Sequence, residues 1–250
     1  VRHWTCVSTC SVYADDATPG QDESGPLLAP WTGTGAAPTE EYGPAKVACE
    51  EAVRETRAAA AYAVTRPGLI VGEGDPSDRF GYWPGRVARA VLDHEPMLVP
   101  PRDTPVQVID VVDYAAWLVT LAEDGASSTG QATYNAVGDS VNVDAVLDAS
   151  ASLVGAAPEA VEVADDWLEE QGVEPWAGPD SLPLWLPPSG YAGFMLRRND
   201  AAKAAGLTIR PLADSVEAAL SWERARGLGR DRRAGLSPAR EAELLARTGS

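Results

Sequence analysis

Tyr42 and Lys46 are the residues of this sequence best suited by type and spacing to proton-transfer chemistry. They form a Y-x-x-x-K pattern at the start of 42–57, where the periodicity predicts a helix. Residues four apart share a helix face, so the phenol and the ammonium group can point into one site. A phenol has an ordinary pKa of about 10, and a fixed positive charge nearby favours its ionised form. Such a tyrosine can exchange a proton while hydride moves at carbon. The alternative is an ordinary exposed helix pair.

The scarcity of lysine supports a chemical role for this pair. Lys46 and Lys203 are the only lysines among 20 basic residues, the others being arginine. Arginine cannot replace lysine where a compact ammonium group is needed. A lysine kept at position 46 therefore favours a functional site.

The elements that must position the pair are a strand before it and a strand after it. An apolar run over 3–8 and another over 62–65 predict buried strands on either side of the helix. Strand, helix and strand in this order predict a parallel βαβ unit, which binds ligands at the carboxyl ends of its strands. The acidic, Pro- and Gly-rich segment 14–41 predicts a long surface loop, and loops of this length are usually functional.

The helix over 42–57 is expected to bury the face that carries Ala45, Cys49, Ala52 and Val53. The rest of the chain alternates less regularly. Its patterns predict helices over 82–92 (starting near Pro84), 112–122 (capped by Asp113), 143–154, 201–205, 211–226 and 238–247, strands over 106–109 and 132–137, and a loop over 165–191. The loop holds Trp167, Trp176 and Trp185, which could wall a pocket, although core packing is the better interpretation.

Composition excludes several classes of function. The net charge of −17 and the pI of about 4.4 argue against nucleic acids and acidic lipid surfaces as partners. The sequence contains no apolar run long enough to span a membrane. Cys6, Cys10 and Cys49 are interpreted as buried thiols of a reducing, cytoplasmic compartment. Neither His3 nor His94 is spaced to complete a metal site with them, so no metal is expected.

Four motifs in a fixed order carry a resemblance to a known family. They are S-T-x-x-V-Y over 8–13, Y-x-x-x-K over 42–46, R-P-G-x-x-x-G over 66–72 and D-V-x-D-x-A over 110–115. The order resembles extended short-chain dehydrogenases/reductases of the NAD-dependent epimerase/dehydratase type, over about residues 1–225. The resemblance implies an α/β fold, namely the C-terminal part of a Rossmann-type doubly wound parallel sheet plus a small α+β substrate-binding domain. The expected boundaries are 1–140 for the NAD(P)-binding part (interleaved with substrate-domain segments from about 75–105), 141–225 for the substrate domain and 226–250 for a tail with a short helix.

The resemblance also implies roles for individual residues. Thr9 would hydrogen-bond the substrate oxygen, Tyr42 would be the general acid/base, and Lys46 would hold the nicotinamide ribose of NAD or NADP and lower the pKa of the tyrosine. Ser8 is the alternative to Thr9, or a residue on the other face of the sheet. The expected cofactor-binding residues are Ser8, Tyr42, Lys46, Pro67, Gly68 and Leu69, and the expected substrate-binding residues are Ser11, Asp78, Arg79 and Tyr82. For the last three the alternative is a solvated turn that leads to a helix cap. Asp110 and Asp113 resemble paired carboxylates, but a helix cap accounts better for Asp113.

The sequence departs from the family pattern in one respect. Intact members begin with a glycine-rich turn, G-x-x-G-x-x-G, that seats the pyrophosphate at a helix N-terminus, and this chain has no such motif. Together with a first residue that is Val1, this suggests a fragment that is inactive alone and binds NAD(P) weakly. We also expect the first strand to leave an open apolar edge.

Two classes of function remain. The first is an oxidoreductase or epimerase acting on a hydroxyl or keto group of a polar small molecule, such as a sugar nucleotide, with a homodimer as a candidate assembly. The second is a non-catalytic relative that acts as a cofactor sensor or RNA-binding scaffold. The negative charge and the presence of Thr9, Tyr42 and Lys46 favour the first.

Overall fold

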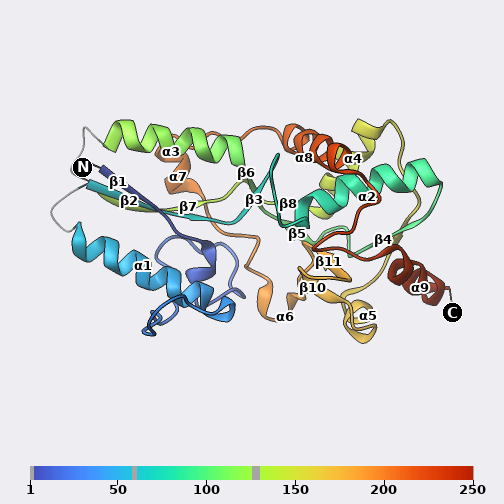
Figure 1. Cartoon of the computed structure of the whole chain (residues 1–250), viewed down its shortest axis with the longest axis horizontal. Coiled ribbons are helices and arrows are strands. Elements are labelled where there is room, and N and C mark those ends of the chain that lie inside the picture. The colour runs from blue at the N-terminus through green and yellow to red at the C-terminus, as the bar shows by residue number, and fades with distance from the viewer. Residues whose placement is uncertain (1–2, 58–60, 126–129, 250) are drawn as a thin grey trace. The chain divides into compact units, whose positions relative to one another are not determined.

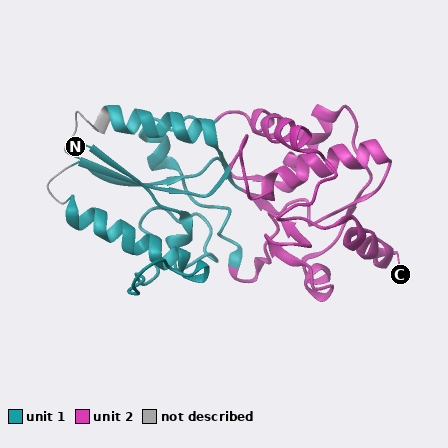
Figure 2. Ribbon diagram, viewed as in Figure 1, with its two compact units in different colours: residues 1–70, 107–139, 191–209 teal, residues 71–106, 140–190, 210–250 magenta. Residues whose placement is uncertain are grey.

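A computed structural model describes residues 3–57, 61–125 and 130–249 of the chain (Figure 1). The chain divides into two compact units (Figure 2). Unit 1 consists of residues 1–70, 107–139 and 191–209, and unit 2 of residues 71–106, 140–190 and 210–250. Both units are thus assembled from three separate stretches of sequence.

Unit 1 is built on a parallel three-stranded sheet. Its strands are β1 (His3–Val7), β2 (Ala61–Pro67) and β7 (Gln131–Ala136), in the order β1-β2-β7. Every residue of β2 is buried, as a central parallel strand requires. Among the described strands β1 lies at an edge of this sheet, with Trp4 43% and Val7 44% exposed. The parallel α/β sheet and the open apolar edge expected from the sequence are confirmed.

Helices cover both faces of this sheet. Adjacent strand residues point to opposite faces, and Thr65 and Arg66 of β2 show which helix lies on each. The Thr65 hydroxyl lies 2.7 Å from the Tyr114 hydroxyl of α3 (Val111–Gly125), whereas Arg66 binds Glu50 of α1 (Tyr42–Thr56). Helices α1 and α3 therefore pack on opposite sides of the sheet (Figure 1).

The core of unit 1 on the α3 side is aromatic. Trp117 of α3 is 2% exposed, packs edge-on against Tyr134 of β7, and donates its indole N–H to the Ala205 carbonyl oxygen after α7 (Asp200–Ala204). Full burial of such a side chain contributes about 1.5–3 kcal/mol. The cluster comprises Ala63, Ile109, Tyr114, Trp117, Leu121, Ala136, Ala202 and Leu207.

The loop 14–41 has little regular structure but is firmly attached to unit 1. It follows the short 3-10 helix η1 (Cys10–Val12) and ends with a second one, η2 (Thr39–Glu41). Glu23 accepts the backbone N–H of Asn135 on its carboxylate and an Arg66 N–H on its carbonyl oxygen. Just before the loop, the Tyr13 ring contacts two guanidinium groups, that of Arg66 at 4.9 Å and that of Arg197 at 4.2 Å from the ring centre.

Unit 2 centres on three packed helices, α2 (Arg79–Asp93), α4 (Val143–Val154) and α8 (Leu212–Arg226). Asn142 caps the start of α4 by accepting the Ala145 N–H, and Gly155 ends it at a φ of 85°, a backbone angle that favours glycine. Short strands accompany the helices: β4 (Met97–Val99) with β9 (Ala160–Glu162), β5 (Pro105–Val106) with β8 (Val141–Asn142), and β10 (Glu174–Trp176) with β11 (Ser181–Pro183). The remaining described elements of the chain are β3 (Leu69–Val71), β6 (Val108–Asp110), α5 (Asp165–Glu170), α6 (Pro188–Tyr191) and α9 (Pro238–Thr248).

Several element boundaries differ from the sequence-based predictions. Helix α2 begins at Arg79, with Pro84 inside it rather than at its start. The strand expected over 106–109 is split between β5 and β6. The segment 165–191 is not a loop throughout, because it contains α5, β10, β11 and α6. Trp185 is fully buried there, in agreement with core packing.

Two predictions about side chains in unit 1 were also wrong. The buried face of α1 carries Gly43, Val47 and Glu50, and Cys49 is exposed instead of buried. Helix α3 begins at Val111, so Asp110 rather than Asp113 caps it, with Oδ1 accepting the Val112 N–H at 2.9 Å.

Candidate active site

Tyr42 and Lys46 lie one turn apart at the start of α1 and face the same side. The Lys46 Nζ is 5.9 Å from the centre of the Tyr42 ring and donates to the Val7 carbonyl oxygen at 3.0 Å. Tyr42 is 48% exposed, so its hydroxyl is open to a ligand. An ammonium group has three N–H donors, which leaves Lys46 with donors for a ligand beside Tyr42.

Thr9 follows the carboxyl end of β1 and caps η1. Its side chain is held in place because Oγ1 accepts the Ser11 N–H and donates to the Ser11 hydroxyl, both at 3.2 Å. The residue is 8% exposed, whereas Ser11 is exposed. A threonine in this position offers a fixed hydroxyl at the strand end where ligands bind in parallel sheets.

Gly43 brings the first turn of α1 against the turn that carries Thr9. A Cβ atom at Gly43 would lie 2.3 Å from the Ser11 carbonyl oxygen, a distance that real Cβ atoms do not reach. Glycine at this position therefore allows the close approach that puts Tyr42 beside the Thr9–Ser11 turn.

Ser8 has a different setting from Thr9. Its hydroxyl donates to the Glu50 carboxylate at 2.6 Å, and both residues are buried. Arg66 donates to the same carboxylate through Nε and Nη2 at 2.9 and 2.8 Å. Burial alone would raise the pKa of Glu50, but the hydrogen bonds from Arg66 and Ser8 outweigh it and hold the pKa below its ordinary value. The Ser8 hydroxyl thus has a structural partner, which favours Thr9 as the residue that meets a substrate.

Pro67, Gly68 and Leu69 lie at the carboxyl end of β2, the same edge as Thr9, because β1 and β2 are parallel. Gly68 donates its N–H to the Ala136 carbonyl oxygen, and a Cβ there would lie 2.9 Å from Val137 Cγ1. The glycine lets this turn pack tightly on the end of β7.

Asp78, Arg79 and Tyr82 belong to unit 2. The Asp78 carboxylate accepts hydrogen bonds from Arg226 at 2.7 Å and Arg230 at 2.5 Å. Burial opposes ionisation, but the hydrogen bonds from Arg230, the Arg233 backbone and Arg226 lower the pKa of Asp78 to about 2. Tyr82 is 2% exposed. The solvated turn weighed as an alternative is wrong for Asp78, because its side chain is only 1% exposed.

The residues of unit 1 fit one end of a nicotinamide dinucleotide. Lys46 supplies an ammonium group suited to ribose hydroxyls, and Tyr42 and Thr9 supply hydroxyls beside it. The described residues contain no group of three His, Cys, Asp or Glu arranged around a metal ion. None of the helices in the described part of the chain has the length and apolar character to cross a membrane.

Sequence reasoning missed the residues that hold this site together. Glu50 and Arg66 lie 16 residues apart and meet only through the βαβ crossover. Gly43 stood inside the Y-x-x-x-K pattern, and a glycine followed by proline in the first helical turn was the one local signal of a close approach.

Comparison with known proteins agrees with this architecture. The putative epimerase from Burkholderia cenocepacia is 17% identical, with a TM-score of 0.61, over 90% of this chain and 64% of that chain. RMD from Pseudomonas aeruginosa, solved with NADPH, is 18% identical, with a TM-score of 0.55, over 89% of this chain and 66% of that one. UDP-glucuronic acid 4-epimerase from Bacillus cereus, solved with NAD, is 15% identical, with a TM-score of 0.55, over 90% and 62%.

These likenesses show the fold, and the chain spans less than two thirds of the length of each of these three solved chains. No match is found among curated protein sequences. The family model described as "NAD dependent epimerase/dehydratase family" matches residues 1–138, which is more than half of the chain. With Thr9, Tyr42 and Lys46 gathered at the carboxyl edge of a parallel sheet, the chain belongs to the NAD-dependent epimerase/dehydratase family.

Proposed function

We propose that this chain carries the catalytic residues of an NAD(P)-dependent epimerase or reductase that acts on a hydroxyl or keto group of a polar small molecule. The observation that carries the proposal is the pairing of Tyr42 and Lys46 on one face of α1, with the Lys46 Nζ 5.9 Å from the tyrosine ring. The fixed hydroxyl of Thr9 lies at the end of β1, on the turn against which Gly43 packs.

The three residues have separate roles. Tyr42 exchanges the proton of the substrate hydroxyl, and its side chain is exposed enough to meet a substrate. Thr9 donates a hydrogen bond to the substrate oxygen as negative charge develops there. Lys46, held by the Val7 carbonyl oxygen, binds the nicotinamide ribose beside the tyrosine. When bound, NAD(P) supplies the hydride acceptor or donor.

A sugar nucleotide is the substrate class that we favour. Support comes from solved relatives of the same fold, among them MoeE5 in complex with UDP-glucuronic acid and NAD, which is 20% identical with a TM-score of 0.56 over 91% of this chain and 66% of that one. The chain has a net negative charge, as does a sugar nucleotide. Arginines at the binding site would balance the negative charges of the ligand.

Substitution of the tyrosine tests the proposal. The full gene product is assayed with NAD+ and NADP+ against a panel of UDP- and GDP-sugars, and turnover is compared with that of Tyr42→Phe. General acid/base catalysis contributes about 100- to 10,000-fold, so we expect Tyr42→Phe to lower kcat by at least about 100-fold. Tyr191→Phe, which alters another exposed tyrosine (44% exposed), is the matched control and should keep full activity. Equal turnover by Tyr42→Phe and the unaltered enzyme would refute the proposal.

A further inference from the structure

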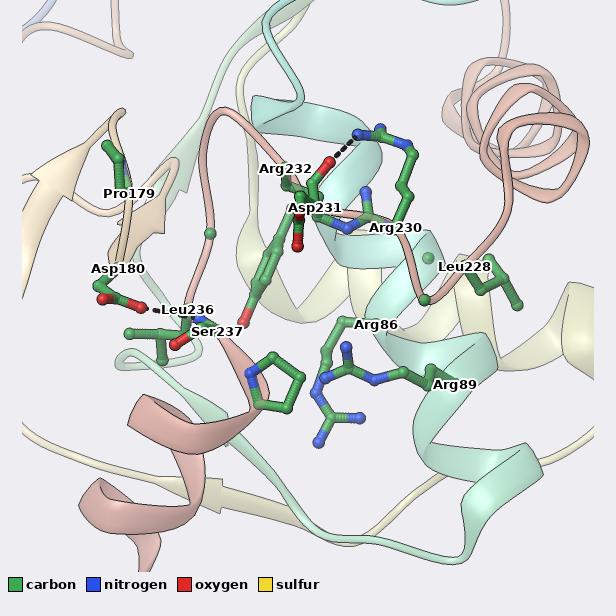
Figure 3. A pocket seen from close by; sticks show the side chains of 15 residues that line it. Arg86, Arg89, Pro179, Asp180, Leu228, Arg230, Asp231, Arg232, Leu236 and Ser237 are labelled. Atoms are coloured by element: carbon green, nitrogen blue, oxygen red, sulfur yellow. Dashed lines mark hydrogen bonds between the residues drawn. The ribbon is translucent and has the colours of Figure 1, made fainter.

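Unit 2 contains a cavity of about 360 Å³ whose walls are rich in arginine (Figure 3). Four arginines line it, two from α2 and two from the segment between α8 and α9. Figure 3 shows Arg86 and Arg89 in the middle of the view, with Arg230 and Arg232 above them. The residues that line the cavity are Tyr82, Gly85, Arg86, Arg89, Pro179, Asp180, Leu228, Gly229, Arg230, Asp231, Arg232, Gly235, Leu236, Ser237 and Pro238.

The α2 contribution follows from helix periodicity. Tyr82, Gly85, Arg86 and Arg89 are spaced i, i+3, i+4 and i+7, so they form one stripe along the helix. Gly85 leaves room for the Arg232 guanidinium, since a Cβ there would lie 2.7 Å from Arg232 Nη2. A side chain at position 85 would therefore displace the Arg232 guanidinium from its present place beside α2.

Several buried donors in this cavity have no partner among the described residues. They are Arg86 Nη1, Arg230 Nε, Arg232 Nη2 and the Tyr82 hydroxyl. The side chains of Arg86, Arg232 and Tyr82 are 3%, 9% and 2% exposed, respectively. A buried donor without an acceptor costs about 1–3 kcal/mol. Four such donors around one cavity indicate a site built for an acceptor-rich ligand.

The charge balance indicates that this ligand is an anion. Within the described residues, five arginines share three buried carboxylates: Arg86 and Arg89 share Glu241, while Arg226, Arg230 and Arg232 share Asp78 and Glu223. The other acids that line the cavity, Asp180 and Asp231, are exposed to solvent. The arginines thus outnumber the carboxylates that they pair with, in a chain whose net charge is −17, and they range from Arg86 at 3% exposed to Arg226 at 30%.

The electrostatics of individual groups agree with this balance. Burial lowers the pKa of Arg232, and Arg230 adds to the effect although Glu223 opposes it. Burial raises the pKa of Tyr82, so its hydroxyl stays protonated and can donate. Both residues line the cavity.

We propose that this cavity of unit 2 binds the phosphate group of a small molecule through Arg86, Arg89, Arg230, Arg232 and Tyr82. A phosphate carries close to two negative charges and three acceptor oxygens, which suits the spare donors and the excess charge better than one carboxylate does. A cavity of about 360 Å³ also lies in the range of small-molecule sites, so it has room for an organic part beyond the phosphate. The site does not depend on the reaction proposed for unit 1.

Titration with inorganic phosphate tests the proposal directly. Unfolding of the full chain is followed at constant ionic strength, and we expect the midpoint to rise saturably with phosphate because a ligand that binds the folded state stabilises it. Glucose 1-phosphate and glucose are titrated in parallel. Tighter binding of glucose 1-phosphate than of phosphate supports a phosphorylated metabolite as ligand, and equal binding supports the free ion. No saturable shift with either, or an equal shift with glucose, overturns the proposal.

Three variants locate the effect. Arg89→Gln removes a charge whose carboxylate keeps Arg86 as partner, so the fold should survive. Loss of one charge-assisted hydrogen bond weakens binding by roughly ten-fold or more, and we expect this for phosphate. Arg247→Gln, at an exposed position of α9 and outside the cavity, is the matched control and should bind as the unaltered chain does.

Tyr82→Phe separates binding from packing. It deletes a hydroxyl without a described partner, so the unliganded chain should be as stable as before or more stable, while phosphate binds more weakly. If Arg89→Gln and Arg247→Gln weaken the response equally, and Tyr82→Phe leaves it unchanged, the assignment of the site is wrong.

Discussion

The main chain of Ser11 meets Gly43 so closely that no side chain fits between them: a Cβ at Gly43 would lie 2.3 Å from the Ser11 carbonyl oxygen. This contact joins the helix of Tyr42 and Lys46 to the turn of Thr9. Because the obstacle is backbone, no change of rotamer can relieve it. The relationship leads to the first of five predictions.

Gly43→Ala should destabilise the protein although alanine favours helices. Overpacking costs roughly 1–3 kcal/mol, against a helix-propensity gain of about 1 kcal/mol at most. We expect a net loss of about 1 kcal/mol in the free energy of unfolding by urea. Gly229→Ala, where a new Cβ meets open space, should be nearly neutral. A Gly43→Ala variant as stable as the unaltered chain would show that the Ser11 contact yields easily.

Glu50→Ala should be among the most damaging single substitutions in unit 1. It leaves the Arg66 guanidinium, which is 2% exposed, without its carboxylate, and breaking a buried pair costs about 3–5 kcal/mol. Glu243→Ala, which breaks exposed pairs with Arg240 and Arg247, should cost about 1 kcal/mol or less. The double variant Glu50→Ala/Arg66→Met should recover part of the loss in the same urea measurement, and no recovery would argue against an uncompensated charge as the cause.

Asp78 should contribute to acid unfolding. Its pKa of about 2 in the folded state lies below the ordinary value of 3.8, so its stabilisation is complete above pH 4 or so and is lost as the pH falls toward 2. Chemical denaturation across this range should show a steep loss of stability in the unaltered chain and a shallower loss in Asp78→Asn. Identical slopes for the two proteins would indicate that other carboxylates control acid unfolding.

Substitution of Ser8 should mainly lower stability, whereas substitution of Thr9 should mainly lower turnover. Ser8→Ala removes a buried hydrogen bond to a carboxylate, worth about 1.5–3 kcal/mol of stability, with little change in kcat. Thr9→Ala should lower kcat of the full gene product by about 100-fold with a smaller effect on unfolding, and Thr9→Ser should restore most of the rate. The reverse pattern, with kcat lost in Ser8→Ala and kept in Thr9→Ala, would make Ser8 the substrate-binding residue.

The 250-residue chain by itself should bind NADH weakly. It contains Lys46 and Tyr42 for the nicotinamide ribose but no glycine-rich turn for the pyrophosphate. Titration calorimetry or NADH fluorescence should give no saturation at micromolar concentrations. Micromolar affinity would mean that other residues of this chain hold the pyrophosphate.

Local signals in the sequence were sufficient to predict the bounds of helices whose ends are set by capping residues. The bounds of α4 were predicted correctly because Asn142 caps its start and Gly155 its end. Helix α2 was placed too late because Pro84 is common in first turns, whereas here it lies inside the helix, among residues buried by α4 and α8. The start of α2 is therefore set by packing against other helices, and the sequence of α2 alone does not show this packing.

The Tyr42–Lys46 pair could be predicted from the sequence because its spacing matches one turn of a helix. The residues that hold the pair in place could not be predicted in this way. Nothing in the sequence marked Glu50 as buried, because its partners are Arg66 on β2 and Ser8 just after β1, which lie on either side of α1 in the sequence. The arginine-lined cavity was invisible for the same reason, since its halves are separated by more than a hundred residues. Only the basic cluster around Arg230, Arg232 and Arg233 hinted at it, in a chain with few positive charges.

The contact of Tyr13 with both Arg66 and Arg197 has a consequence for the order of folding during synthesis. The three residues come from the beginning, the first third and the last quarter of the chain, so this contact closes a long loop of sequence. Such contacts form late and slow folding. Unit 1 includes the segment 191–209, so its packing cannot be completed before this segment has been made. Strands β1 and β2 therefore depend for their packing on a segment of the chain that is synthesised long after them.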